Sequence, residues 1–325
     1  MRNLVPLAMK VVISVSFTVV NAAAHAVWPD DQPIKIIVPQ AAGGTNDTLA
    51  RLVGAELSKI LNQTVVIDNR PGAAGAIGMQ ATVQAPPDGY TIALASDSAV
   101  LLDVLRPNLP WKFKSGLQGV AMIGEQPISI AASSKSSFKT LQNVIDLAKE
   151  KPASLGYASS GIGSSQNIVG EWLASLAGVK LVHVPYKGGG QAANDLVSGQ
   201  IPLAVLGLAP MLKQHQAGNV RILAVTTPDR DSALPDIPTL SELGYPQIAL
   251  AQWAGLVAPV ATPELIIQKL SDAILKVLAL PAVRKKLLEA GVTPRPANYK
   301  QFDEFLKKSV DTWAEVVPAL NIQIQ

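Results

Sequence analysis

From residue 34 onward, the hydrophobic and polar positions of this 325-residue chain alternate between two kinds of segment. Compact apolar runs, such as residues 34–39 (IKIIVP), 90–95 and 201–206, have the composition of buried strands. Between such runs, apolar residues recur at helical spacing, as they do over residues 49–60. This alternation predicts an α/β fold with mainly parallel sheets covered by helices on both faces.

The same patterns predict most of the remaining elements. Further strands are expected at residues 64–67, 119–123, 128–133, 155–158, 179–184, 221–225 and 249–258. Helices are expected at residues 141–149, 168–176 and 192–197, and over 263–318 with breaks at Pro281 and Gly291. A strand, a Gly/Ser/Thr-rich turn and a helix occur near residue 40 and again near residue 160. We therefore expect two sheets of related construction, each presenting a helix N-terminus at its carboxyl edge.

The N-terminal segment has the form of a secretory signal peptide. Arg2 and Lys10 precede an apolar stretch at residues 11–20, which is too short to span a bilayer because that takes about twenty residues. Ala24-His25-Ala26 then matches the small-x-small pattern of a cleavage site, and the absence of cysteine excludes a lipid anchor there. We expect residues 1–26 to be a signal peptide and the mature chain to be exported.

Composition excludes several classes of function. The chain has no cysteine, which rules out disulfides, thiol catalysis and thiolate metal sites. Only His183 and His215 remain after the signal peptide, and neither belongs to an HxxxH or HExxH pair, so we expect no metal and no cofactor. A net charge of +3 gives no reason to expect a nucleic-acid partner.

Two glycine-rich loops are the candidate binding elements. In open α/β sheets, ligands bind beyond the carboxyl ends of the strands, where a helix N-terminus offers unpaired N–H groups and a partial positive charge. Residues 43–46 (GGTN) and 160–165 (SGIGSS) fit this description. Facing each other across a cleft, they would hold a carboxylate without any arginine. Each loop taken alone fits an ordinary tight turn and helix cap somewhat better than a binding element.

Other positions leave alternatives open. Neither loop is a nucleotide motif, because Gln166 stands where a third glycine would be required and the P-loop lysine is missing. A third turn, residues 188–190 (GGG), fits either ligand contact or a tight strand-to-helix turn. Asp47 fits a first-turn helix position better than a ligand contact, unless the ligand is cationic.

Four further side chains, two polar and two aromatic, fit structural as well as ligand-binding positions. Structural roles are favoured for His183, in an apolar strand pattern, and for Asp195, on its helix. Tyr186 and Trp253 each fit a position in the hydrophobic core and a position lining the cleft equally well.

Six segments occur in a characteristic order and spacing over essentially the whole mature chain. They are WPDDQPIKIIVP (28–39), AGGTND (42–47), VIDNRPGAAGAIG (66–78), PPDGYTI (86–92), YASSGIGSSQ (157–166) and VHVPYKGGGQAANDLVSGQI (182–201). In these segments the chain resembles the tripartite tricarboxylate transporter substrate-binding family, also called Bug or TctC-like proteins.

The resemblance implies a type II-like, two-domain periplasmic binding protein fold that closes on its ligand like a flytrap. Domain 1 would comprise residues 27–127 and 251–325, with domain 2 (128–250) inserted between them. The resemblance also implies a monomeric receptor without catalytic residues. It would capture a small organic carboxylate and deliver it to the membrane permease subunits of a tripartite transporter.

Site residues are likewise implied by position. In the family, N–H groups and hydroxyls of the first and fifth strand-to-helix loops hold the carboxylate. This chain departs from the family at Gln40, usually aromatic, and at Ala42, usually proline, so Gln40 is expected to add a polar contact. The full set of expected ligand-binding residues is Gln40, Gly44, Thr45, Asn46, Asp47, Ser96, Asp97, Ser160, Gly161, Gly163, Ser164, Ser165 and Gly188.

Two other functions remain as alternatives to a transport receptor. The same fold could serve a sensing receptor that passes its closed state to a signalling partner, and only a neighbouring permease or sensor-kinase gene would discriminate the two. A soluble α/β enzyme is the other alternative. It is disfavoured by the absence of cysteine, the two sparse histidines and the lack of a G-x-S-x-G motif.

Overall fold

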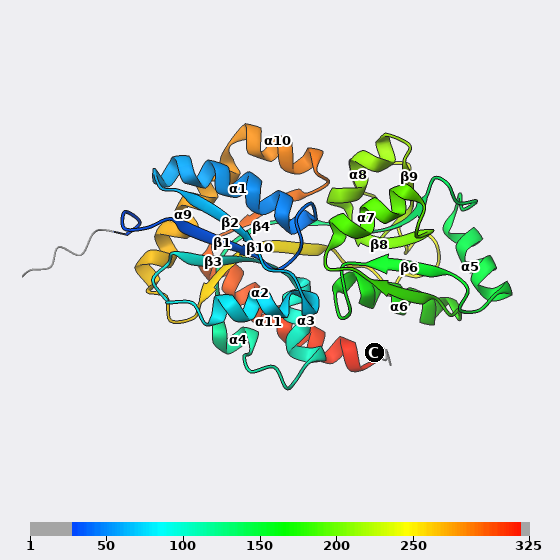
Figure 1. The fold of residues 1–325 in the computed structure, drawn as a ribbon, viewed down its shortest axis with the longest axis horizontal. Coiled ribbons are helices and arrows are strands. Elements are labelled where there is room, and N and C mark those ends of the chain that lie inside the picture. The colour runs from blue at the N-terminus through cyan, green and yellow to red at the C-terminus, as the bar shows by residue number, and fades with distance from the viewer. Residues whose placement is uncertain (1–27, 320–325) are drawn as a thin grey trace, which may run out of the picture.

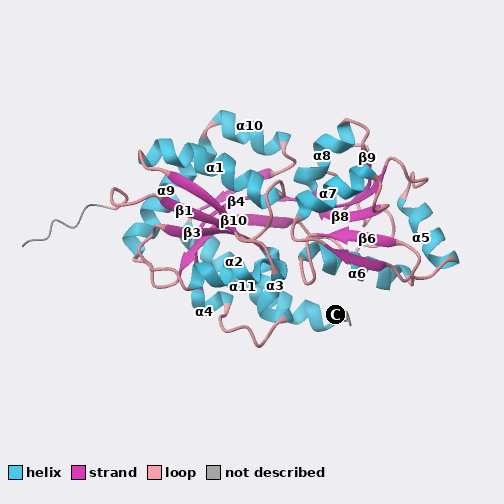
Figure 2. Ribbon diagram, viewed as in Figure 1, coloured by secondary structure: helices cyan, strands magenta, loops and turns pink. Residues whose placement is uncertain are grey.

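A computed structural model describes residues 28–319, and the expected signal peptide lies outside these residues. The described chain forms two β-sheets that follow one another along the long axis of the molecule, each flanked by helices (Figures 1 and 2). We refer to the two halves as the large-sheet domain and the small-sheet domain.

The large-sheet domain contains six strands in the order β11-β4-β10-β3-β1-β2. They are β1 (Ile34–Val38), β2 (Val65–Asn69), β3 (Thr91–Ser96), β4 (Leu117–Gln126), β10 (Gln252–Pro259) and β11 (Thr293–Ala297). One face packs against α1 (Thr45–Leu61), α9 (Glu264–Ala279) and α10 (Pro281–Glu289). The other face is covered by α2 (Ala76–Val83), α3 (Asp97–Leu105), α4 (Phe113–Gly116) and α11 (Tyr299–Ala319).

The small-sheet domain contains five strands in the order β7-β6-β8-β5-β9. They are β5 (Ile128–Ser133), β6 (Gly156–Ser159), β7 (Val182–Pro185), β8 (Leu203–Gly207) and β9 (Val220–Val225). Apolar side chains of α5 (Leu141–Glu150) and α6 (Ser165–Ala177) fill one face. Those of α7 (Gly189–Ser198) and α8 (Leu208–Gln216) fill the other.

The predicted two-domain α/β fold is confirmed, with the refinement that both sheets are mixed. β1 pairs in parallel with β2 and β3, and β6 pairs in parallel with β7 and β8. By contrast, β10 is antiparallel to β3 and β4, and β5 is antiparallel to β8 and β9. The reason is the path of the chain, since β4 leads out of the large sheet and β10 returns into it alongside.

The sequence did not reveal every element. Residues 263–318 were expected to be entirely helical, but β11 interrupts them and pairs only with β4 at the sheet edge. Its sequence, TPRPA, contains two prolines, which an edge strand tolerates because one side of its backbone needs no ladder partner. The short helices α3 and α8 were not predicted either.

Within residues 28–319, no helix combines the length and hydrophobicity needed to cross a bilayer.

The two sheets draw on separate stretches of the chain, and we propose that the domain limits follow the sequence-based division at residues 127–128 and 250–251.

Candidate ligand-binding site

A cavity of about 210 Å³ lies between the two domains. The large-sheet domain contributes residues 39–40, 72–75 and 106, and the small-sheet domain contributes residues 160–162 and 185–187. Because both domains supply its walls, a molecule bound there would contact both halves of the protein. The cavity therefore lies where a ligand can influence the relative position of the domains.

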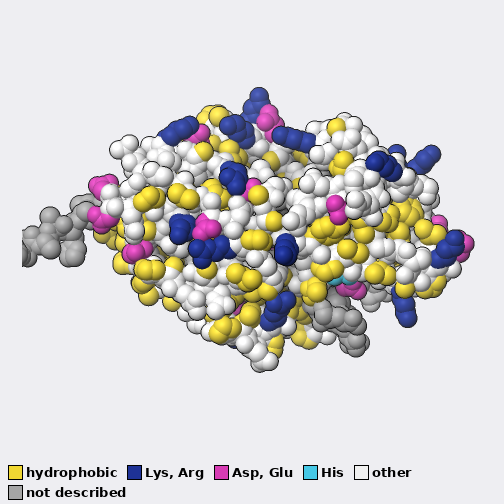
Figure 3. Space-filling model, in the orientation of Figure 1, with side chains coloured by type: hydrophobic (Ala, Val, Ile, Leu, Met, Phe, Trp, Pro, Cys, Tyr) yellow, Lys and Arg dark blue, Asp and Glu magenta, His cyan; other side chains and the backbone are white. Residues whose placement is uncertain are grey.

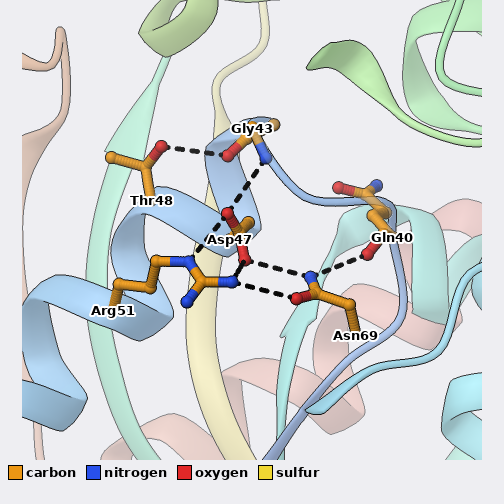
Figure 4. Close-up of polar contacts among 7 residues, drawn as sticks. Gln40, Gly43, Asp47, Thr48, Arg51 and Asn69 are labelled. Atoms are coloured by element: carbon orange, nitrogen blue, oxygen red, sulfur yellow. Dashed lines mark hydrogen bonds and ion pairs between the residues drawn. The ribbon is translucent and has the colours of Figure 1, made fainter. Parts of the chain in front are cut away.

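The loop between β1 and α1 is organised around the carboxylate of Asp47, which is only 4% exposed. Its Oδ2 accepts hydrogen bonds from the N–H of Gly43 at 2.9 Å and from Nε of Arg51 at 3.0 Å, while Oδ1 accepts from Nδ2 of Asn69 at 3.0 Å (Figure 4). Nδ2 of Asn69 also donates to the carbonyl oxygen of Gln40 at 3.1 Å. Asp47 thus ties the loop to α1 and β2.

The ionisation of Asp47 follows from these contacts. Burial by itself raises the pKa of a carboxyl group, but the hydrogen bonds from Arg51, Gly43 and Asn69 outweigh it and lower the pKa of Asp47. The carboxylate is therefore charged at neutral pH, with both oxygens engaged inside the protein. This arrangement favours a structural role at the helix start over ligand contact.

The domains touch directly at the first loop. The N–H of Ala41 donates to the carbonyl oxygen of Lys187 across the domain boundary at 3.2 Å. A Cβ built on Gly190, in α7, would lie 2.8 Å from the carbonyl oxygen of Ala42 and 2.9 Å from the carbonyl carbon of Gly43. Glycine at position 190 is thus what allows the start of α7 to approach this loop.

The loop between β6 and α6 is built around two glycines in the left-handed region. Gly161 has φ +136° and Gly163 has φ +81°. Oγ of Ser164 accepts from the N–H of Asn167 and caps α6, and the N–H of Gly163 donates to Oδ1 of Asn167. Oγ of Ser160 donates to Oε1 of Gln166 at 2.8 Å. These contacts hold the loop in one shape and leave residues 160–162 along the cavity wall.

His183 contacts this loop through the hydroxyl of Ser159. Its Nε2 lies 2.6 Å from Oγ of Ser159, and that hydroxyl also accepts from the N–H of Gly161 at 3.1 Å. Burial lowers the pKa of His183 to about 4, so the imidazole is neutral at neutral pH. This agrees with the structural role that the sequence favoured for His183.

We expect His183→Gln to change the pH dependence of stability. Because the folded pKa of about 4 is below the unfolded value of 6.5, the unfolded chain binds more protons between these values, and the wild type loses stability as pH falls through this window. Glutamine does not titrate, so the variant does not lose stability in this way. The wild-type free energy of unfolding should therefore drop by about 1–2 kcal/mol relative to the variant between pH 7.5 and pH 4.5, allowing for partial exposure.

Urea unfolding of both chains at the two pH values measures this difference, and subtraction removes the contributions of other titrating groups. A difference that stays constant with pH would contradict the assigned ionisation of His183.

A second set of interdomain contacts lies at the N-terminus of α3. Oγ of Ser98 accepts from the N–H of Ser165 at 3.2 Å and lies 3.3 Å from its Oγ. Nε2 of Gln252 donates both to Oδ1 of Asp97 and to Oγ of Ser165, each at 3.2 Å. Nε2 of Gln126 donates to Oε1 of Gln252 at 2.8 Å. The crossing strands β4 and β10 therefore supply amides that join the two domains.

The residues expected at the site fall into two groups. Three of them line the cavity of about 210 Å³: Gln40, Ser160 and Gly161. The others lie in the supporting loops, helix N-termini and domain contacts: Gly44, Thr45, Asn46, Asp47, Ser96, Asp97, Gly163, Ser164, Ser165 and Gly188. Ser96 ends β3 opposite Ala254 of β10, and Ser98, two residues further on, accepts the N–H of Ser165 across the domain boundary.

Sequence reasoning missed several lining residues. Arg106 follows α3 on one wall, and Lys187 follows β7 on the other. Tyr186, for which the sequence left core and cleft-lining positions open, lines the cavity as well. Residues 72–75 also line the cavity, within the segment VIDNRPGAAGAIG that carried part of the family resemblance. No motif surrounds Arg106, so only the folded structure brings it to the site.

The charged side chains that line the cavity are all positive. Its lining includes the cations Arg106 and Lys187 and no acidic side chain. Neither cation takes part in the ion pairs found between described residues. The described residues hold no cluster of three or more His, Asp or Glu side chains arranged to bind a metal ion. The cavity is suited to a small anion.

Comparison with known proteins identifies the family. The model of the tripartite tricarboxylate transporter family receptor matches residues 49–322. The chain belongs to this family. Protein BugT of Bordetella pertussis is 34% identical over 288 residues, covering 88% of each chain.

Solved structures agree with this assignment. The periplasmic binding protein BugD is similar with a TM-score of 0.87 and 29% identity, over 91% of this chain and 99% of BugD. MatC from Rhodopseudomonas palustris, solved with bound malate, is similar with a TM-score of 0.84 and 29% identity, over 89% of this chain and 99% of MatC. The protein is therefore a solute-binding receptor with the periplasmic binding protein fold, and not an enzyme.

Proposed function

We propose that this receptor captures a small organic carboxylate in the interdomain cavity, in the periplasm, and delivers it to the permease subunits of a tripartite tricarboxylate-type transporter. The observation that carries the ligand class is the combination of two unpaired cations, Arg106 and Lys187, with the turn at Ser160–Ile162 in a cavity free of acidic side chains. Guanidinium and main-chain N–H groups are preferred partners of carboxylates.

Size supports the same class of ligand. A cavity of about 210 Å³ is smaller than the roughly 300–1,000 Å³ of pockets that hold drug-sized molecules. A compact acid with few carbon atoms therefore fits better than a sugar oligomer or a nucleotide. MatC, a structural relative, was solved with malate, a molecule of this kind.

The proposed capture step follows from the domain contacts. A ligand between Arg106 and residues 160–162 would attract both walls and favour the closed arrangement of the domains. The closed receptor would then present a composite surface of both domains to the permease. On the face in Figure 3, basic and acidic side chains are interspersed, so this docking does not call for a uniformly charged partner.

Thermal unfolding of the mature chain against matched ligand sets tests the proposal. The sets are small mono-, di- and tricarboxylates, the corresponding amides, and the corresponding amines. Ligand at a hundredfold excess over its dissociation constant stabilises the fold by about 2.7 kcal/mol, so a carboxylate should raise the melting temperature while its amide does not. Stabilisation by neutral or cationic compounds alone would overturn the ligand class.

Arg106→Gln should weaken binding of the selected acid about 10- to 100-fold, because a charge-assisted hydrogen bond to the carboxylate is lost. Arg106→Lys should retain part of the affinity. Arg284→Gln is the matched control, since Arg284 is an exposed cation on α10 and does not line the cavity. Titration calorimetry measures all three variants, and equal affinity of Arg106→Gln and wild type would contradict the role of Arg106.

A further inference from the structure

Helix α3 of the large-sheet domain packs against α6 of the small-sheet domain. Leu101 of α3 and Ile168 of α6 are both fully buried and belong to one apolar cluster, against which the partly buried Leu105 packs. A Cβ built on Gly163, in the loop before α6, would lie 3.3 Å from Cδ1 of Leu105. Because the two helices belong to different domains, this close packing depends on how the domains are arranged.

Asp97, the first residue of α3, is an acid inside this interdomain contact, and it is only 2% exposed. Its Oδ1 accepts hydrogen bonds from the N–H of Ser98 at 3.0 Å and from Nε2 of Gln252 at 3.2 Å. The same Nε2 donates to Oγ of Ser165 in the small-sheet domain at 3.2 Å. The carboxyl group is therefore part of the polar network that joins the two domains.

The surroundings of Asp97 favour its neutral form. Its Oδ2 has no hydrogen-bond partner among the described residues, and Asp97 takes part in none of the ion pairs found between them. Uncharged groups of α3, α6 and β10 face it, and the one charged side chain that shares its surface groove is Lys308, exposed on α11. A buried carboxylate without a paired cation is unfavourable, so burial raises the pKa of Asp97 to about 7, although its hydrogen bonds lower it.

We propose that Asp97 makes closure of the domains sensitive to pH: the closed receptor takes up a proton on this carboxyl group, and the open receptor releases it. This regulation rests on the proposed capture of a ligand by domain closure. When the domains separate, α6 and Ser165 move away from α3, and water reaches the carboxyl group. The charged form is then hydrated and no longer disfavoured by burial.

The direction of the effect follows from linkage. Exposure in the open receptor returns the pKa of Asp97 toward its ordinary value of 3.8, so the closed receptor binds more protons between that value and about 7. Falling pH in this window therefore favours closure. Between pH 8 and pH 6 the ratio of closed to open receptor should rise about tenfold, and ligand affinity should rise with it.

Spin labels measure this ratio without any ligand. The chain has no cysteine, so labels can be attached through Ala55→Cys on α1 and Asn194→Cys on α7, two exposed positions in different domains. Pulsed electron–electron double resonance then gives the populations of closed and open chains at pH 8, 7 and 6. We expect the closed-to-open ratio to rise about tenfold in the labelled wild type and to stay constant when Asp97→Asn is added.

Titration calorimetry with the acid selected by thermal unfolding measures the same effect on binding. The affinity of the wild type relative to Asp97→Asn should rise about tenfold from pH 8 to pH 6, and taking this ratio removes the titration of the ligand and of other groups. Asp97→Ser, a smaller neutral residue, is the second variant if the asparagine chain does not fold. Asp146→Asn is the matched control, since Asp146 is an exposed acid on α5, and it should keep the wild-type pH dependence.

The two measurements separate this proposal from the proposed ligand class. If neither the closed-to-open ratio nor the relative affinity changes with pH, proton-linked closure is overturned, while carboxylate capture stands on its own binding data. A rise in the closed-to-open ratio that is absent from Asp97→Asn, in a receptor that binds no carboxylate, would support proton-linked closure and contradict the ligand class.

Discussion

Gly190→Val should abolish tight ligand binding and leave both domains folded. A Cβ at this position would lie 2.8 Å from the carbonyl oxygen of Ala42, across the domain boundary. The obstructing atoms belong to the backbone, so no side-chain rotation can relieve the clash and the domains must separate. Position 190 is inside α7, where valine adopts the backbone conformation without strain. Overpacking costs about 1–3 kcal/mol or more, which corresponds to roughly a 10- to 100-fold loss of affinity.

The neighbouring glycine provides a matched control. A Cβ on Gly189 would meet only side-chain atoms of Leu206 and Pro210 of its own domain, at 3.7 and 3.8 Å. Gly189→Ala should therefore bind nearly as the wild type does, while Gly190→Ala shows a smaller version of the valine effect. Calorimetry measures affinity, and small-angle scattering in the presence of ligand measures closure. A compact, tightly binding Gly190→Val chain would contradict closure as the basis of capture.

Gly161→Ala should reduce affinity about 10- to 100-fold and also lower stability. Gly161 has φ +136°, a conformation that L-residues rarely adopt, and forcing it costs about 1–3 kcal/mol. A Cβ would also lie 3.2 Å from the carbonyl oxygen of Tyr186, tighter than an ordinary contact. The turn would therefore shift, and its N–H groups would move along the cavity wall.

Gly178→Ala is the control for backbone strain, because it introduces strain at a position that does not line the cavity. Gly178 has φ +63°, ends α6 in the same domain, and a Cβ there would meet no atom within 4 Å. It should lower the melting temperature modestly and leave the dissociation constant unchanged. Equal affinity losses in Gly161→Ala and Gly178→Ala would mean that general destabilisation, and not the shape of the turn, controls binding.

The repeated strand–loop–helix pattern was enough to predict the fold. Runs such as residues 34–39 are apolar because both sheet faces are covered, and the glycines of the loops at 43–44 and 161–163 mark the turns that begin α1 and α6. β11 could not be predicted, since TPRPA has neither the alternation nor the composition of a strand and depends on pairing with β4. Antiparallel pairing by β10 likewise depends on the path between the domains.

The candidate site was predictable only where a local motif marks it. Ser160 and Gly161 occur in a glycine-rich loop that the sequence singles out, whereas Gln40 was expected only because the family usually has an aromatic residue at its position. No motif marks Arg106. It reaches the cavity because of the direction that α3 takes after β3 and because the other domain packs close to it. Gln126 and Gln252 lie far apart in the sequence and meet because β4 and β10 cross the domain boundary side by side.

A crystal structure with the acid selected by thermal unfolding tests the central claim most directly. We predict one carboxylate in the interdomain cavity, with its oxygens within hydrogen-bond distance of the N–H groups of Ser160 and Ile162 and of the Arg106 guanidinium, since the N–H of Gly161 already donates to Oγ of Ser159. An acid bound elsewhere, with Arg106 and this turn free of contact to it, would contradict the account.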